Sequence, residues 1–167
     1  MIIFDSSTLI LTSKTELLEP FLGSIGLEVA IPAEVARECC GAKKTMDALR
    51  IQRALDDSRI EIITVANGRL VSKLQADFSL GRGEAEVIAL ALKTNAQLVA
   101  IDDKNGINAC KFLGLAFTTA IGILLRSYHR GMLDRDNALA TLKNLTAFGR
   151  YADAIVEDAR LKLKERL

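Results

Sequence analysis

Short apolar runs alternate with longer amphipathic segments along this chain. The apolar runs predict five strands, at residues 2–4, 27–32, 60–65, 97–102 and 115–119. Helical spacing of apolar residues predicts helices between these runs, at residues 7–13, 15–26, 33–40, 45–58, 67–78 and 84–95. Within the last of these, the run VIALAL is apolar on nearly every side, so we expect this helix to be deeply buried.

Strands that alternate with helices favour right-handed βαβ units and a parallel sheet. We therefore expect an α/β protein, a three-layer α/β/α sandwich with a five-stranded parallel sheet. The length of 167 residues suits one domain. We assign residues 1–167 to a single domain with a C-terminal helical extension at about 120–167, in which three helices are separated near Gly131 and Gly149.

Acidic residues follow two of the predicted strands. IIF runs into Asp5, and LVAI runs into Asp102 and Asp103. In a parallel sheet, ligands bind beyond the carboxyl ends of the strands, and the crossover helices begin near that edge. Glu84 opens one such helix, so we expect all four acids at one rim of the sheet. The helix after the second strand adds Glu34 or Glu38.

Each of these acids alone has an equally good structural explanation. An acid in the first turn of a helix interacts favourably with the helix dipole, and an acid after a strand often forms a turn or a cap. Several convergent carboxylates repel one another, however, and a divalent cation would neutralise them. Hard oxygen ligands suit Mg²⁺ or Mn²⁺.

Four segments in this order resemble the four acidic blocks of the PIN domain: MIIFDSSTLI, IPAEVARECC, GRGEAEVIALAL and LVAIDD. The stretch TTAIGILL is also similar to the family. PIN domains include metal-dependent ribonucleases such as the VapC toxins of toxin–antitoxin pairs. The resemblance implies hydrolysis of RNA phosphodiester bonds with Mg²⁺ or Mn²⁺ and no side-chain nucleophile, in a VapC-like toxin. Its implied partners are single-stranded or structured RNA, an antitoxin protein and a second copy of the chain.

The same resemblance assigns roles to individual residues. Asp5, Glu38, Glu84 and Asp102 match the four catalytic acids, and Glu38 fits the second block better than Glu34 does. The implied metal ligands are Asp5, Glu84 and Asp102, with Asp103 as an accessory ligand. Ser7 matches the small polar residue that helps to orient the site. The third acid is often Asp in the family, whereas this chain has Glu84.

Four cations flank the acidic blocks and are candidate contacts for RNA phosphates: Lys43, Lys44, Arg82 and Lys104. For each cation taken alone, a solvated surface residue is the favoured interpretation over a phosphate contact. The chain has 22 Lys and Arg against 21 Asp and Glu, so its net charge attracts nucleic acid only weakly. A local basic patch must therefore hold the substrate.

Other functions fit the sequence less well. Three cysteines, two of them adjacent, form a poor disulfide framework and indicate a reducing cytoplasm, while a single histidine disfavours zinc and a Ser-His-Asp triad. No apolar run reaches the ~20 residues of a membrane helix, so we expect no membrane association. A haloacid dehalogenase-type phosphatase needs a second acid two residues after Asp5, but position 7 is Ser, so this class is disfavoured. A receiver domain needs paired acids after the first strand, but Phe4 precedes Asp5, so this class is disfavoured too. The alternative from another class is a non-catalytic PIN-like module that binds RNA or protein.

Overall fold

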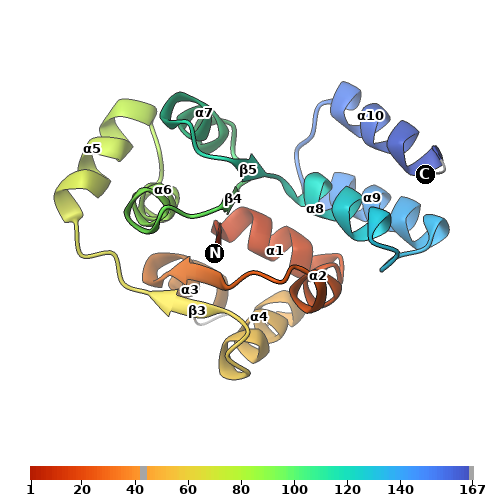
Figure 1. Cartoon of the computed structure of the whole chain (residues 1–167), viewed down its shortest axis with the longest axis horizontal. Helices are drawn as coiled ribbons and strands as arrows, with labels where there is room; N and C mark the ends of the chain where they lie inside the picture. Colours follow the sequence, from red (N-terminus) through yellow and green to blue (C-terminus); the bar gives the residue numbers. More distant parts are fainter. Residues whose placement is uncertain (42–44, 166–167) are drawn as a thin grey trace.

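A computed structural model describes residues 1–41 and 45–165 of the chain (Figure 1). Its five strands form one parallel sheet in the order β3-β2-β1-β4-β5. The strands are β1 (Ile2–Phe4), β2 (Val29–Pro32), β3 (Glu61–Ile63), β4 (Leu98–Ala100) and β5 (Phe117–Thr118). The predicted α/β fold with a five-stranded parallel sheet is thereby confirmed, although four of the strands are shorter than the apolar runs that predicted them.

The strand order reverses direction beside β1, and this reversal determines where a ligand crevice is expected. The chain moves outward from β1 through β2 to β3, and then returns to β4 and β5 on the other side of β1. Phe4 of β1 pairs with Ala100 of β4, and the Asp5 N–H donates to the Ala100 carbonyl oxygen at 2.9 Å. In such sheets the crevice at the carboxyl ends of the two strands flanking the reversal is where ligands bind.

Seven helices join the strands of the sheet: α1 (Ser6–Lys14), α2 (Leu18–Ser24), α3 (Ala33–Cys40), α4 (Met46–Asp56), α5 (Gly68–Phe78), α6 (Arg82–Thr94) and α7 (Lys104–Leu113). Right-handed crossovers predict α1–α4 on one face and α5–α7 on the other, because the chain reverses its direction across the sheet after β3. The helix contacts agree, since α1 packs on α2, α3 and α4 and α6 packs on α5 and α7, while α3 also contacts α6. The result is the three-layer α/β/α sandwich that the sequence predicts. Helix α6 packs on β1, β2 and β4, and residues 85–91 of it are all buried, as its apolar run predicts.

Helix α7 lies in a segment for which the sequence pattern predicts no helix. Its segment KNGINACKFL contains Asn105, Gly106 and Asn108, which are all poor helix formers. Two features compensate: Asp103 caps the first turn, and Gly114 ends the helix at φ +69°. Gly106 is needed for packing, because a Cβ atom there would lie 2.2 Å from Cδ1 of Ile101.

Three further helices follow β5, namely α8 (Ala120–His129), α9 (Arg135–Phe148) and α10 (Asp153–Lys164). They pack on one another, α8 contacts α1 and α2, and α9 contacts α1, at the blue end of Figure 1. Among the described residues, none of the helices is both long enough and apolar enough to cross a membrane. The loop between α9 and α10 returns to the sheet edge, where Tyr151 contacts Asp102.

Candidate functional site

Asp5 lies at the end of β1, beneath the surface of the crevice. Only 1% of it is exposed, and its Oδ1 accepts a hydrogen bond from Thr8 N at 2.8 Å, so Asp5 is also the N-cap of α1. Ser7 Oγ donates to Asp5 Oδ2 at 2.6 Å and restrains the orientation of the carboxyl group. Burial raises the pKa of Asp5 to about 7 against the lowering effect of these hydrogen bonds, and the charge of Asp102 adds to the increase.

Asp102 is held by three donors from three separate segments. Thr8 Oγ1 of α1 donates to Asp102 Oδ2 at 2.8 Å, and the N–H of Ala120, at the start of α8, donates to the same oxygen at 2.9 Å. Tyr151 donates its hydroxyl hydrogen to Oδ1 at 2.7 Å. Burial and the neighbouring Asp102 both raise the pKa of Tyr151, so its hydroxyl stays protonated and donates. One carboxylate therefore ties α1, α8 and the C-terminal loop to the end of β4.

Asp103 and Glu84 each cap the helix that begins at the rim. Asp103 Oδ1 accepts from the N–H groups of Asn105 at 2.7 Å and Gly106 at 3.2 Å, at the start of α7. Glu84 Oε2 accepts from Gly81 N at 2.8 Å, at the start of α6. Burial raises the pKa of Glu84, and the charges of Asp103 and Glu38 raise it further against the lowering effect of the Gly81 bond.

Glu38 and Glu34 lie on α3 but have different surroundings. Both carboxylate oxygens of Glu38 rest against Gly83 of α6, where an added Cβ atom would lie 2.8 and 2.9 Å from them. Glu34 instead pairs with Arg37, whose Nε donates to Glu34 Oε2 at 3.0 Å, and this bond lowers the pKa of Glu34. The contact with Gly83 places Glu38 beside the first turn of α6, and the charge of Glu38 also raises the pKa of Glu84.

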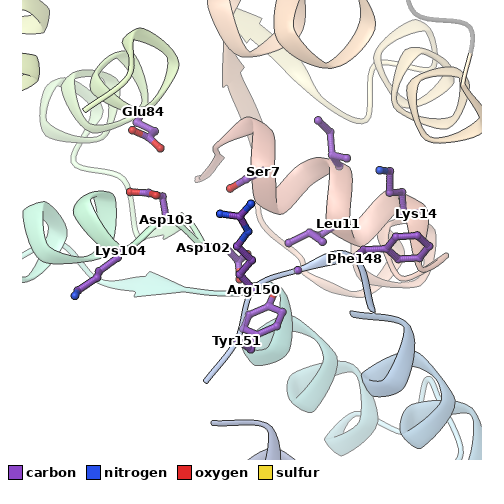
Figure 2. Close-up of a pocket in the computed structure, with 12 residues that line it drawn as sticks. Ser7, Leu11, Lys14, Glu84, Asp102, Asp103, Lys104, Phe148, Arg150 and Tyr151 are labelled. Atoms are coloured by element: carbon purple, nitrogen blue, oxygen red, sulfur yellow. Dashed lines mark hydrogen bonds between the residues drawn. The ribbon is translucent and has the colours of Figure 1, made fainter. Parts of the chain in front are cut away.

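A cavity of about 510 Å³ opens over Glu84, Asp102 and Asp103, whereas neither Asp5 nor Glu38 is part of its lining (Figure 2). Glu84, Asp102 and Asp103 line one end of it, and Lys14 and Phe148 line the other. The floor between the two ends is the exposed side of α1, and the far wall is the loop after α9. Ser7, Ile10, Leu11, Lys104, Gly149, Arg150 and Tyr151 complete the lining.

The predicted phosphate-binding cations have different positions. Lys104 is exposed and lines the cavity beside the carboxylates. Arg82 donates from Nε to Glu86 Oε1 at 3.1 Å and lines a smaller, separate cavity with Glu86. Lys43 and Lys44 lie outside the described residues. The structure thus brings Lys104 to the acidic cavity and places Arg82 in a different cavity.

Three residues of this site carry no local sequence signal. Thr8 belongs to a hydroxyl cluster after the first strand, but nothing near it in sequence indicates a bond to Asp102. Tyr151 and Arg150 reach the cavity from the C-terminal loop, and Tyr151 is 49 residues from its partner Asp102. Only a long-range pairing signal between positions 102 and 151 could have identified Tyr151 from sequence.

The donor chemistry of the rim fits a hard divalent cation. A carboxylate offers about four acceptor positions. The hydrogen bonds described above leave acceptor capacity on Asp5, Glu84 and Asp103, and one position on Asp102. The described residues nevertheless contain no group of three or more acids, cysteines or histidines arranged to hold a metal ion. This is compatible with Mg²⁺, which usually keeps several waters and uses only one or two carboxylates.

The fold and the rim together define an α/β protein with an acidic cavity at the reversal of strand order. A family model described as a PIN domain matches residues 1–165, so the chain belongs to the PIN-domain family. PIN domains are generally nucleases and typically use divalent metals. A comparison with curated proteins found no match.

Proposed function

We propose that this protein is a metal-dependent endoribonuclease that hydrolyses RNA phosphodiester bonds, and that it is the VapC-like toxin of a toxin–antitoxin pair. One observation carries the proposal: Glu84, Asp102 and Asp103 line one cavity, and Asp5 lies beneath them with a raised pKa. Carboxylates from three different connections are expensive to bring together without a cation. Family membership supports the same activity.

In this proposal, the candidate ligands are Asp5, Glu84 and Asp102, with Asp103 as an accessory ligand; one or two of these carboxylates would bind the cation directly and the others would bind it through its waters. When bound, Mg²⁺ or Mn²⁺ supplies neutralising charge at the scissile phosphate and makes a coordinated water more acidic. Asp102 needs little reorganisation to act, because three hydrogen bonds already orient its carboxylate. Ser7 has the same role towards Asp5.

The remaining residues of the cavity act on the substrate or on the charge of the site. The exposed side chains of Lys104 and Arg150 give the RNA phosphates a positive partner. Glu38 contributes negative charge beside Glu84 and so increases the demand for a cation. Water is the nucleophile, and no side chain forms a covalent intermediate.

We also propose two protein partners, an antitoxin that blocks the cavity and a second copy of the chain in a homodimer. Helix α10 of the extension at residues 120–167 has exposed apolar side chains, with Ile155 51% and Leu161 53% exposed. At about 100° per residue these two side chains lie about 120° apart around the helix, so they do not form one patch, and the partner proposal rests on family membership. We also propose a cytoplasmic location, which agrees with the reduced thiols of Cys39, Cys40 and Cys110.

The test is cleavage of a labelled single-stranded RNA by the purified protein with Mg²⁺, with Mn²⁺ and with chelator. We expect cleavage only with metal, and no cleavage of duplex DNA at the same salt concentration. Glu38→Gln should lose most of the cleavage, and Glu34→Gln, the matched change four residues earlier, should keep it because Glu34 is paired with Arg37. Loss in Glu34→Gln with retention in Glu38→Gln would reverse our assignment of the second acid.

A non-catalytic module that binds RNA or protein is the second candidate. It is favoured by the absence, among the described residues, of three acids arranged around one metal position. It predicts RNA binding without turnover at any metal concentration. Metal-dependent turnover that is abolished by Asp5→Asn, in a variant that still folds, would exclude this candidate.

A further inference from the structure

The cavity extends well beyond the carboxylates, and its far end has a different chemistry. From Ser7 to Lys14 the floor follows α1 for about 10 Å, at 1.5 Å per residue. At that end Lys14 Nζ lies 5.4 Å from the centre of the Phe148 ring. Figure 2 shows Arg150 between the two ends, with its guanidinium group directed towards Ser7.

Arg150 is a charged side chain that its neighbours leave unpaired. Within the described part of the chain it makes no hydrogen bond or ion pair, although three carboxylates line the same cavity. Its backbone is nevertheless fixed on both sides. Helix α9 ends just before it at Phe148, and Tyr151 just after it is bonded to Asp102.

Gly149 makes this arrangement sterically feasible. A Cβ atom at Gly149 would lie 2.5 Å from Cε2 of Tyr151 and 3.0 Å from the Leu145 carbonyl oxygen. A side chain here would therefore push the Tyr151 ring away from Asp102. The loop thus fixes the backbone of Arg150 on the wall of the cavity, and the exposed, unpaired guanidinium is available to a phosphate.

Phe148 presents the other half of a nucleotide-binding surface. Its ring is 56% exposed although it lines the cavity, so one face is available to a ligand. Aromatic rings that stack on unpaired bases, beside cations that contact the backbone, are how proteins bind single-stranded nucleic acid. Lys14, over the same ring, adds a second cation at this end.

We propose that Phe148, Arg150 and Lys14 form a subsite for the nucleotide next to the scissile phosphate of single-stranded RNA. Arg150 binds the phosphate, Phe148 stacks on the base, and Lys14 binds the backbone on its far side. The subsite rests on the proposed ribonuclease function, because its position matters only if a phosphate occupies the acidic end. Tyr151 is a positioning residue that anchors the loop.

The test is binding of a short fluorescent single-stranded RNA in chelator, measured by anisotropy over a range of salt concentrations. Arg150→Gln should weaken binding about tenfold, and should reduce the slope of log K against log[salt] by about 0.7, the value for one phosphate contact. Phe148→Leu should weaken binding about fivefold or more with no change of slope, because it removes a ring and no charge.

Two control variants match these changes elsewhere on the protein. Arg135→Gln removes an exposed arginine about 20 Å away along α9, and Phe112→Leu replaces a ring that is 80% exposed on α7. Both should bind RNA as wild type does. With metal present, Arg150→Gln should raise KM and leave kcat nearly unchanged, which is the result expected for lost ground-state binding.

The subsite proposal is overturned if Arg150→Gln matches Arg135→Gln, or if Phe148→Leu matches Phe112→Leu. It is also overturned if duplex RNA binds as tightly and is equally sensitive to Phe148→Leu, since a paired base cannot stack on the ring. Binding in chelator does not depend on catalysis. Absence of cleavage with metal therefore tests the ribonuclease function separately from the subsite.

Discussion

The β1–α1 and β4–α7 junctions both place an acid between a buried strand and a helix, but they do so in different ways. Both run from a buried strand through an acid into a helix, and the two strands are neighbours in the sheet. At β1–α1 one residue has both roles, because Asp5 caps the helix and faces the site. At β4–α7 the roles are divided, with Asp103 as the cap and Asp102 free to point across the crevice.

This division has an electrostatic consequence. The single acid of β1–α1 must be buried at the helix start, and burial raises the pKa of Asp5 to about 7. The extra residue at β4–α7 leaves Asp102 half-buried, where donors from α1, α8 and the C-terminal loop reach it. Asp5, whose buried charge reduces stability, therefore lies beside Asp102, whose carboxylate accepts hydrogen bonds from three segments.

The largest expected effect is on the pH dependence of stability at Asp5. A pKa raised from 3.8 to about 7 corresponds to about 4 kcal/mol. The folded state binds the proton more tightly, so this stabilisation is fully present below pH 3.8 and is lost as the pH rises through about 7. Relative to Asp5→Asn, wild type in chelator should therefore lose about this much unfolding free energy between pH 4 and pH 8, measured by denaturant titration.

The matched control for Asp5→Asn is Asp134→Asn. Asp134 is also an Asp N-cap, of α9, but it is exposed, so there is no burial cost to remove. Asn is as good an N-cap as Asp, so neither change should lose the cap itself. A pH profile for Asp5→Asn that coincides with those of wild type and Asp134→Asn would show that Asp5 carries no burial penalty.

Whereas Asp5→Asn should raise stability at high pH, Asp102→Asn should lower it. Its amide nitrogen cannot accept hydrogen bonds, so at least one of the donors Thr8, Ala120 and Tyr151 loses its acceptor. We expect a loss of about 1–3 kcal/mol in chelator at pH 8, where Asp5→Asn should gain stability. The measurement is thermal or denaturant unfolding of both variants under identical conditions, and shifts of the same sign would contradict the division of roles.

Tyr151→Phe should cost less than Asp102→Asn, because it removes one donor of three. We expect a loss of about 1 kcal/mol, the net value of one hydrogen bond at a partly exposed position. A double-mutant cycle with Asp102→Asn checks the cause, since the two losses should not add if they report the same bond. Tyr128→Phe, the other tyrosine, is the control. Fully additive losses would show that Tyr151→Phe and Asp102→Asn do not report the same hydrogen bond.

Sequence patterns located the parts of this site that local chemistry determines. An acid directly after an apolar strand, as at Asp5 and Asp102, must lie at the carboxyl edge of a parallel sheet. Glu84 likewise follows from the helix start that Gly81 and Gly83 mark. These inferences need only neighbouring residues, and the structure places all three acids at one edge.

Other features depend on residues far apart in the chain, and the sequence could not provide them. Whether Glu34 or Glu38 adjoins the rim depends on Arg37 and on space at Gly83. Helix α7 has poor intrinsic propensity and is stabilised by its caps and by packing. The contact of Tyr151 with Asp102 exists only once the C-terminal helices have packed on α1. The Tyr151–Asp102 contact and the position of Glu38 against Gly83 are tertiary effects that local propensity does not encode, whereas the caps of α7 are local signals that helix propensity alone leaves out.

Of these variants, Gly83→Ala should have the smallest effect on stability, but it should still reduce RNA cleavage. The added Cβ atom would lie 2.8 and 2.9 Å from the Glu38 carboxylate oxygens, so the flexible end of Glu38 must move away from the rim. The bond from Gly81 N to Glu84 is not affected. Ala is favoured over Gly in a helix by about 0.5–1 kcal/mol, which offsets the displacement, so the unfolding free energy should stay within about 1 kcal/mol of wild type.

RNA cleavage by Gly83→Ala should nevertheless fall towards the level of Glu38→Gln, because both changes remove the Glu38 charge from its place beside Glu84. Gly68→Ala is the matched control, since Gly68 also begins a helix and has nothing within 4 Å of the added Cβ position. The experiment compares metal-dependent cleavage rates and denaturant unfolding for the three variants. Wild-type cleavage by Gly83→Ala would mean that Glu38 acts from elsewhere or not at all, and that the rim consists only of the two strand junctions and Glu84.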